Sequence, residues 1–135
     1  MVPDIEIQHL SVCFDTAQGP VYAVNDLSTT FRAGRISGVI GESGSGKSVT
    51  SLSIMGLLQH PGRVVDGEIF FQDQDILSYG KRRMRRVRGK EIAMIFQDPM
   101  TSLNPVYTVG NQIMEMLQEH EDIGKGEAKR RAIEM

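Results

Sequence analysis

The chain has 135 residues, of which 40% are hydrophobic and 24% charged, and this suits one ordinary domain with its own core. Its formal net charge of −2 gives no global attraction to nucleic acid or to anionic lipid. Cys13 is the single cysteine, so an internal disulfide is excluded and a reducing compartment is expected. The first residues lack the apolar run of a signal peptide, and no stretch of roughly eighteen apolar residues follows. These features predict a soluble cytoplasmic domain.

Several segments have the patterns of β-strands. Residues 5–14 alternate imperfectly between apolar and polar side chains, which predicts a strand with one solvated face. Residues 21–31 predict a second strand, and we expect the two to form an antiparallel layer. The short apolar runs 36–41 and 92–96 are typical of strands covered on both faces. Residues 67–77 predict a hairpin.

Three segments have helical patterns. The first extends from Lys47 to about Leu58, where a proline and a glycine end it. Thr108 is the expected N-cap of a second helix. One apolar face of that helix is formed by Val109, Ile113, Met116 and Leu117. A last helix over 128–135 stops without any C-terminal signal, so the chain is predicted to be cut off.

The most specific motif is the octet "GESGSGKS", which begins at Gly41 and fits the pattern G-x-x-x-x-G-K-[ST]. A predicted buried strand precedes it and a predicted helix follows it, as this motif requires. Gly41 is expected to let the chain leave the strand sharply. Gly44 and Gly46 are expected to adopt backbone angles that a Cβ would oppose. A flexible glycine-rich turn is the alternative, and the matching context favours a phosphate-binding loop.

Each part of the octet has a role in binding phosphate. Its N–H groups can converge on phosphate oxygens at the positive end of the following helix. Lys47 supplies a point charge to the β- and γ-phosphates, and Ser48 supplies a hydroxyl ligand for Mg²⁺. Glu42 is expected to face away from the nucleotide. The nucleotide-binding residues predicted in and directly after the loop are Gly41, Glu42, Ser43, Gly44, Ser45, Gly46, Lys47, Ser48 and Val49.

Features around the octet narrow the class of phosphate-loop protein. Two strand-like segments precede the octet, and Gln97 follows Lys47 by fifty residues, directly after a predicted strand. The segment around Gln97 is "MIFQDPMTSLNP". Here the sequence resembles the nucleotide-binding subunit of ATP-binding cassette (ABC) transporters, and within them the oligopeptide/dipeptide/nickel importer family. The resemblance covers essentially the whole chain from about Ile5.

The resemblance implies an α/β fold. It has a P-loop NTPase core with an N-terminal antiparallel β layer and the start of an α-helical subdomain, in truncated form. Residues 1–96 would form the β-rich subdomain and phosphate-loop core, and 97–135 the glutamine loop and start of the helical subdomain. Together, 1–135 would be the N-terminal part of one nucleotide-binding domain. The family's signature motif, catalytic glutamate and switch histidine do not occur in these 135 residues.

The resemblance also assigns roles to single residues. Lys47 and Gln97 would be catalytic, with Gln97 touching Mg²⁺ or the attacking water, and Ser48 and Gln97 would be metal ligands. An amide can serve this purpose because it offers both an acceptor and donors.

The adenine contact is assigned in the same way. Phe14 would stack on adenine, with Tyr22 as the other candidate and a core aromatic as the structural alternative. Val49 replaces a threonine common at this place in other cassettes, and its backbone N–H can still reach phosphate.

The implied function is that of the ATP-binding subunit of an ABC importer, an ATPase using ATP and Mg²⁺. Hydrolysis would drive uptake of di- or oligopeptides or a related solute such as nickel or glutathione. Residues 97–105 would contact membrane-spanning permease subunits, and a second ATP-binding subunit would complete the dimer at the cytoplasmic face of the plasma membrane. The chain alone is expected to bind Mg-nucleotide weakly and not to hydrolyse it.

Two alternatives remain open. One is a nucleic-acid-associated ABC-type ATPase and the other is a non-functional truncated remnant. Seven of the ten residues in 81–90 are basic, but no aromatics interleave them, so a solvated surface is expected and no nucleic-acid partner. His9, His60 and His120 show no metal-ligand spacing with Cys13, so we expect no zinc site.

Overall fold

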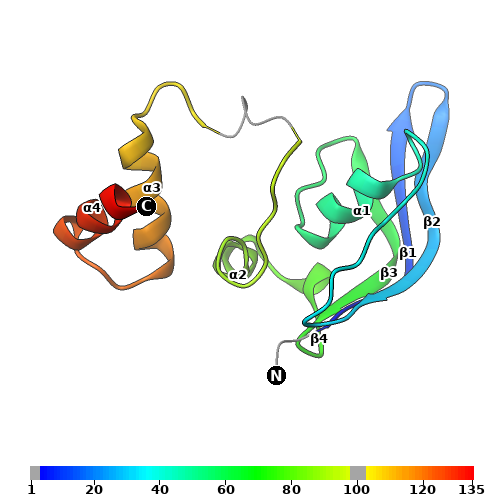
Figure 1. Ribbon diagram of the computed structural model, residues 1–135. Helices are drawn as coiled ribbons and strands as arrows, with labels where there is room; N and C mark the ends of the chain where they lie inside the picture. The colour runs from blue at the N-terminus through cyan, green and yellow to red at the C-terminus, as the bar shows by residue number, and fades with distance from the viewer. Residues whose placement is uncertain (1–3, 98–102) are drawn as a thin grey trace. The chain divides into compact units, whose positions relative to one another are not determined.

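The structure is a computed structural model that describes residues 4–97 and 103–135 (Figure 1). It divides into two compact units, the first ending at Met84 and the second running from Arg85 to Met135. The boundary after Phe96 that the resemblance implies remains a prediction. No helix in the described ranges has both the length and the apolar character needed to cross a bilayer.

The first unit is built on a four-stranded antiparallel sheet in the order β2-β1-β3-β4. β1 pairs on one side with β2 and on the other with β3, so it is the central strand (Figure 1). The antiparallel N-terminal layer and the later hairpin are therefore confirmed. The bounds of the strands are β1 Ile5–Thr16, β2 Gly19–Phe31, β3 Gly62–Phe71 and β4 Gln74–Asp75.

The core of this unit lies mainly on the central strands, where apolar side chains are removed from water. Burial of such side chains is the main favourable term in folding, at roughly 1.5–3 kcal/mol for each large one. A helix residue and two residues after the hairpin complete the core. The buried apolar residues of this unit are Ile7, Leu10, Val12, Cys13, Val24, Met55, Ile69, Phe71, Ile76 and Met84.

A β-bulge in β1 explains its imperfect alternation. His9 has a left-handed backbone with φ 53°, and its pairing register shifts against both neighbouring strands. Asp26 on β2 has the same φ, and its carboxylate lies 2.7 Å from Nδ1 of His9. Gly67 on β3 has φ 91°, and a Cβ there would lie 2.5 Å from the carbonyl oxygen of His9. The bulge at His9 therefore affects the backbone of β1 and of both neighbouring strands, and β3 requires glycine opposite it.

Helix α1 (Lys47–Ile54) begins where predicted and ends a few residues early. Its end is a Schellman motif centred on Gly56, whose φ is 58°. The N–H of Gly56 donates to the carbonyl of Ser53 at 3.0 Å, and the N–H of Leu57 donates to that of Leu52 at 2.8 Å. A left-handed glycine therefore stops the helix before the predicted proline-glycine signal is reached.

Helix α2 (Lys81–Val87) follows a short 3-10 turn at Ile76–Ser78 and was not predicted. Met84 and Val87 are buried, at 5% and 6% exposure, while the basic residues around them are exposed. Two apolar residues three positions apart in a charged run were the signal for an amphipathic helix.

The predicted buried strands at 36–41 and 92–96 are wrong for this chain. Both runs are irregular, and Ile36, Ile40 and Ile95 are 104%, 97% and 98% exposed. A strand needs a neighbour that shares its hydrogen bonds, and a parallel sheet needs covering elements on both faces. Within the described residues, the only pairing near these runs is an isolated bridge between Arg88 and Ile92.

The second unit contains α3 (Val109–His120) and α4 (Lys125–Glu134), which pack against each other. Thr108 is the N-cap of α3, and its hydroxyl accepts a hydrogen bond from the N–H of Asn111 at 3.3 Å, as predicted. α4 begins three residues earlier than expected and buries Ala128 completely. An ion pair with Arg131 joins Glu121 to α4 and lowers the pKa of that carboxyl.

Candidate functional site

The glycine-rich octet forms a tight loop that leads directly into α1. Gly44 and Gly46 have φ angles of 83° and 89°, in the left-handed region that the sequence analysis expected for them. Gly46 is the N-cap of α1. Gly41 plays a different part from the predicted one, because no strand precedes it. A Cβ on Gly41 would lie 2.5 Å from Oγ of Ser45, so glycine allows the loop to close on itself.

The ammonium group of Lys47 holds the two ends of this loop together. Its Nζ donates to the carbonyl oxygens of Gly41 at 2.7 Å and Glu42 at 2.6 Å, and to Oγ of Ser45 at 3.1 Å. The carbonyl of Glu42 also accepts from the N–H of Ser45 at 3.2 Å. The cation therefore lies inside a ring of loop oxygens.

The beginning of α1 supplies a second source of positive potential. The first intrahelical bond runs from the N–H of Thr50 to the carbonyl of Gly46 at 2.8 Å. The N–H groups of Lys47, Ser48 and Val49 precede that bond and have no intrahelical acceptor. No acidic residue lies in the first turn to compete for them. Unpaired N–H donors and the positive end of a helix dipole favour a negative charge, and binding of phosphate at this place remains a prediction.

The loop is fixed to the sheet through β2. A Cβ on Gly46 would clash with the carbonyl oxygen of Ala23 and lie 3.2 Å from Cγ2 of Val24, which is buried. Ser53, about two turns further along α1, is also buried, and its hydroxyl donates to the carbonyl of Val49 at 2.8 Å. This close approach of helix to strand gives Gly46 a packing requirement besides its left-handed backbone.

Several predicted residues line the open side of this loop. Ser48 is the second residue of α1 and is exposed, so its hydroxyl oxygen is available to a hard cation such as Mg²⁺. The remaining members of the predicted set, Glu42, Ser43 and Ser45, are also exposed. It is the backbone carbonyl of Glu42 that meets Lys47.

Phe14 lies in the same unit as the loop. It is half-buried in β1 and pairs with Val21 of β2, two residues before the strand segment that Gly46 touches. A Cβ on Gly62 would lie 2.6 Å from Cε1 of Phe14, so one part of the ring covers that glycine. Tyr22, the other candidate, is 57% exposed. Stacking of either ring on a base remains a prediction.

The backbone around Phe14 is held by a neighbouring ion pair. Arg63 donates to the carboxylate of Asp15 at 3.0 Å, joining β3 to β1 at the residues next to Gly62 and Phe14. The hydrogen bond from Arg63 lowers the pKa of the Asp15 carboxyl. Both side chains are more than half exposed, so the pair acts mainly as a local clamp.

Gln97 is exposed, lies in a bend and belongs to the second unit. Residues 98–102, which make up most of the predicted permease-contacting segment, lie outside the described residues. The approach of Gln97 to the phosphate loop and the contact through 97–105 remain predictions.

Gln112 shapes the end of this segment and was not predicted from the sequence. Its Nε2 donates to the carbonyls of Asn104 at 2.9 Å and Tyr107 at 3.1 Å, and its Oε1 accepts from the N–H of Asn104 at 2.9 Å. The Asn104 side chain accepts from the N–H of Val106 at 3.0 Å. Asparagine before proline is a turn signal that could have drawn attention to this place.

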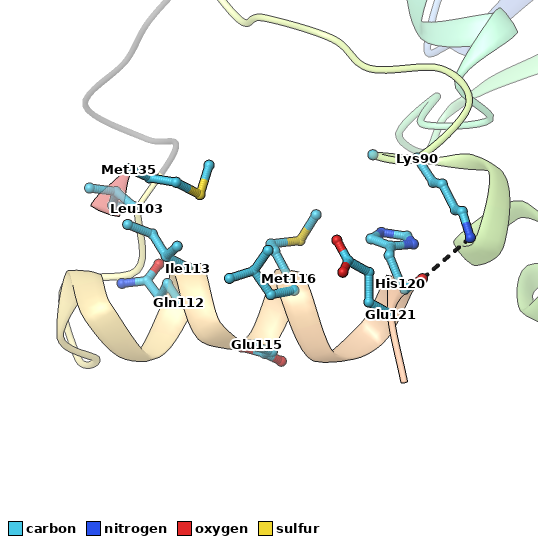
Figure 2. Close-up of a pocket in the computed structure, with 11 residues that line it drawn as sticks. Lys90, Leu103, Gln112, Ile113, Glu115, Met116, His120, Glu121 and Met135 are labelled. Carbon is cyan, nitrogen blue, oxygen red and sulfur yellow. Dashed lines mark hydrogen bonds between the residues drawn. The ribbon is translucent and has the colours of Figure 1, made fainter. Parts of the chain in front are cut away.

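Part of the predicted apolar face of α3, without Val109, lines a groove of about 790 Å³ in the second unit (Figure 2). Ile113 and Met116 point into it from α3. Leu117 also lines it. Met116 is 51% exposed and no residue of α3 is buried. The apolar residues of α3 are therefore not covered by other described residues.

Comparison with known proteins identifies the class. The family model described as "ABC transporter" matches residues 24–135, and the chain belongs to this family. Among solved structures, it is similar to the ATP-binding cassette MJ0796 in a dimeric post-hydrolysis state bound to ADP and Pi. The TM-score is 0.78 and the identity 19% over 96% of this chain and 54% of that one, which shows the fold. The predicted cassette fold is therefore confirmed.

Curated relatives narrow the similarity further. The chain is 47% identical over 131 residues to the dipeptide transport ATP-binding protein DppD of Escherichia coli, covering 97% of this chain and 40% of that protein. It is 47% identical to the oligopeptide transport ATP-binding protein OppD of Salmonella typhimurium and 48% identical to that of Bacillus subtilis, covering 97% of this chain and 39% and 37% of theirs. The chain thus spans about 40% of the length of these relatives.

The close contact between loop and strand makes a prediction about glycine. Gly46→Ala should lower the free energy of unfolding by about 1–3 kcal/mol, because it strains a left-handed backbone and moves the loop off Ala23. Gly38→Ala is the matched control, since a Cβ there meets nothing within 4 Å. Urea unfolding of the two variants measures the difference, and equal stabilities would contradict the assigned contact.

Proposed function

We propose that this chain is the nucleotide-binding part of an ATP-binding subunit in an ABC importer of di- or oligopeptides. The observation that carries the proposal is the phosphate cradle. It combines the ammonium of Lys47, held 2.6–3.1 Å from three loop oxygens, with the free N–H groups that open α1. Both elements favour negative charge at the same place. The names of the similar proteins support the peptide class of the solute.

Binding of a triphosphate would change the partners of Lys47. In the structure its ammonium interacts with neutral carbonyl and hydroxyl oxygens. A hydrogen bond from an ammonium to a phosphate joins two opposite charges and is stronger than one to a neutral oxygen, so the ammonium would turn from the loop to the β- and γ-phosphates. The loop oxygens therefore keep the cation positioned at the mouth of the site before the nucleotide enters.

The residues at hand fit the expected Mg²⁺ ion. Magnesium prefers hard oxygen ligands and keeps several waters, and Ser48 offers an exposed hydroxyl beside the cradle. Gln97 would add an amide oxygen from the second unit. When bound, the ion would neutralise charge on the phosphates as the terminal one is transferred to water.

In the complete protein, hydrolysis of ATP would drive transport. We propose that the subunit pairs with a second ATP-binding subunit and contacts membrane-spanning permease subunits through 97–105. It would lie peripherally at the cytoplasmic face of the plasma membrane. The described residues on their own would bind Mg-nucleotide weakly and turn it over negligibly, because the groups that activate water are not among them.

Removal of the lysine ammonium tests the cradle. Lys47→Ala should weaken binding of Mg-ATP by roughly tenfold or more, because a charged hydrogen-bond donor is lost from the phosphate site. Lys125→Ala is the control, since Lys125 is an exposed lysine at the start of α4. Isothermal titration calorimetry on the wild type and both variants gives the affinities. Equal affinity of wild type and Lys47→Ala would defeat the assignment.

A second experiment tests the adenine contact. Phe14→Leu should weaken binding of ATP by about 5- to 150-fold, the range that loss of one base-stacking contact corresponds to. Binding of inorganic tripolyphosphate should stay the same, because it has no base. Tyr22→Leu is the matched control and should leave both affinities unchanged. Equal losses for ATP and tripolyphosphate in Phe14→Leu would show that the ring has a structural role only.

A further inference from the structure

Helix α2 carries a one-sided basic surface that nucleotide binding does not use. At 3.6 residues per turn, Lys81, Arg85, Arg82 and Arg86 occupy an arc of about 140° on this helix. All four are exposed. Met84 and Val87 lie on the opposite side and are buried. We call the four basic residues the α2 basic face.

The charge of this face is not neutralised locally. Residues 81–90 contain no acid. Elsewhere Arg63, Arg130 and Arg131 each have a carboxylate partner within hydrogen-bonding distance. In the part of the chain that the structure describes, Lys81, Arg82 and Arg86 have no such ion pair, and Arg85 has only a long one of 3.8 Å to Glu119. The net charge of −2 therefore conceals a concentrated positive surface.

The neighbouring cation, Arg83, is engaged within the fold. Its guanidinium lies 3.7 Å from the ring centroid of Tyr79 and also donates to the side chain of Gln74. These contacts place Arg83 towards the hairpin and leave it out of the basic face. The face consequently presents charge alone, with no aromatic ring among its members.

We propose that the α2 basic face binds an anionic lipid bilayer. A protein interface would need an apolar centre, and this face has none. Recognition of single-stranded nucleic acid would need stacking rings, which are also missing. A negatively charged membrane surface requires only clustered Lys and Arg, and four to eight of them on an amphipathic helix are a sufficient number. The proposal stands independently of nucleotide binding.

Vesicle binding tests this proposal. The wild-type chain, without nucleotide, should co-sediment with vesicles of phosphatidylcholine containing phosphatidylglycerol and should not bind phosphatidylcholine alone. Raising the salt concentration from about 0.05 M to 0.5 M should abolish binding, since screening shortens the reach of surface charges. Each basic residue near the surface strengthens partitioning about fivefold.

Charge reversal identifies the surface. The triple variant Lys81→Glu/Arg82→Glu/Arg86→Glu should lose more than about tenfold in partitioning onto anionic vesicles. The control Arg35→Glu/Lys125→Glu/Lys129→Glu makes the same change in net charge at three other exposed residues and should keep partitioning within about threefold of the wild type. Circular dichroism and calorimetry with Mg-ATP check that both variants are folded and keep their nucleotide affinity.

Several results would overturn the proposal. They are equal binding to neutral and anionic vesicles, an equal loss in both triple variants, and binding to a DNA duplex or an acidic polypeptide without binding to anionic vesicles. The Lys47→Ala variant should lose nucleotide binding and keep vesicle binding. Failure of the nucleotide-site assignment is therefore distinguishable from failure of the membrane assignment.

Discussion

The site depends on one electrostatic arrangement: a lysine ammonium held by loop oxygens at the point where a helix begins. Lys47 binds the carbonyls of Gly41 and Glu42 and so closes the loop that precedes it. The N–H groups of the first three residues of α1 have no intrahelical acceptor, since the first helical bond runs from Thr50 to Gly46. Because Gly46 packs against the Ala23 carbonyl, this arrangement is fixed to the sheet. The loop geometry therefore follows from local bonds and one contact to β2.

Local features were predictable from the sequence. The octet, the antiparallel strands and the cap at Thr108 depend on residues close together in the chain, and the structure has them. The runs at 36–41 and 92–96 were not predictable in the same way, because a strand forms only where another strand pairs with it. Their apolar composition is typical of buried strands, yet Ile36 and Ile95 are fully exposed here. Their partners are not found among the described residues.

The site shows the same division between local and distant information. The left-handed glycines followed from the motif, whereas the contact between Phe14 and Gly62 depends on the register of β1 with β3. Helix α2 was overlooked because its charge concealed two apolar residues three positions apart. The role predicted for Gln97 depends on residues distant from it in the chain, because the phosphate loop belongs to the first unit and Gln97 to the second.

The family and the site together give a consistent account. A cassette fold at 47% identity to peptide-transport ATP-binding proteins carries a glycine-rich loop whose lysine ammonium is held by the carbonyls of Gly41 and Glu42. The basic face of α2 adds a surface suited to a membrane, where a transporter subunit would work. The two features lie on different helices and use different residues, so either can be altered without removing the other.

A crystal structure with a non-hydrolysable Mg-ATP analogue would test the central claim most directly. The account predicts that the β- and γ-phosphates lie at the start of α1 and that the ammonium of Lys47 has moved from the loop carbonyls to phosphate oxygens. A nucleotide bound elsewhere, or a Lys47 ammonium still bound to the carbonyls of Gly41 and Glu42 with the phosphates at the start of α1, would contradict it.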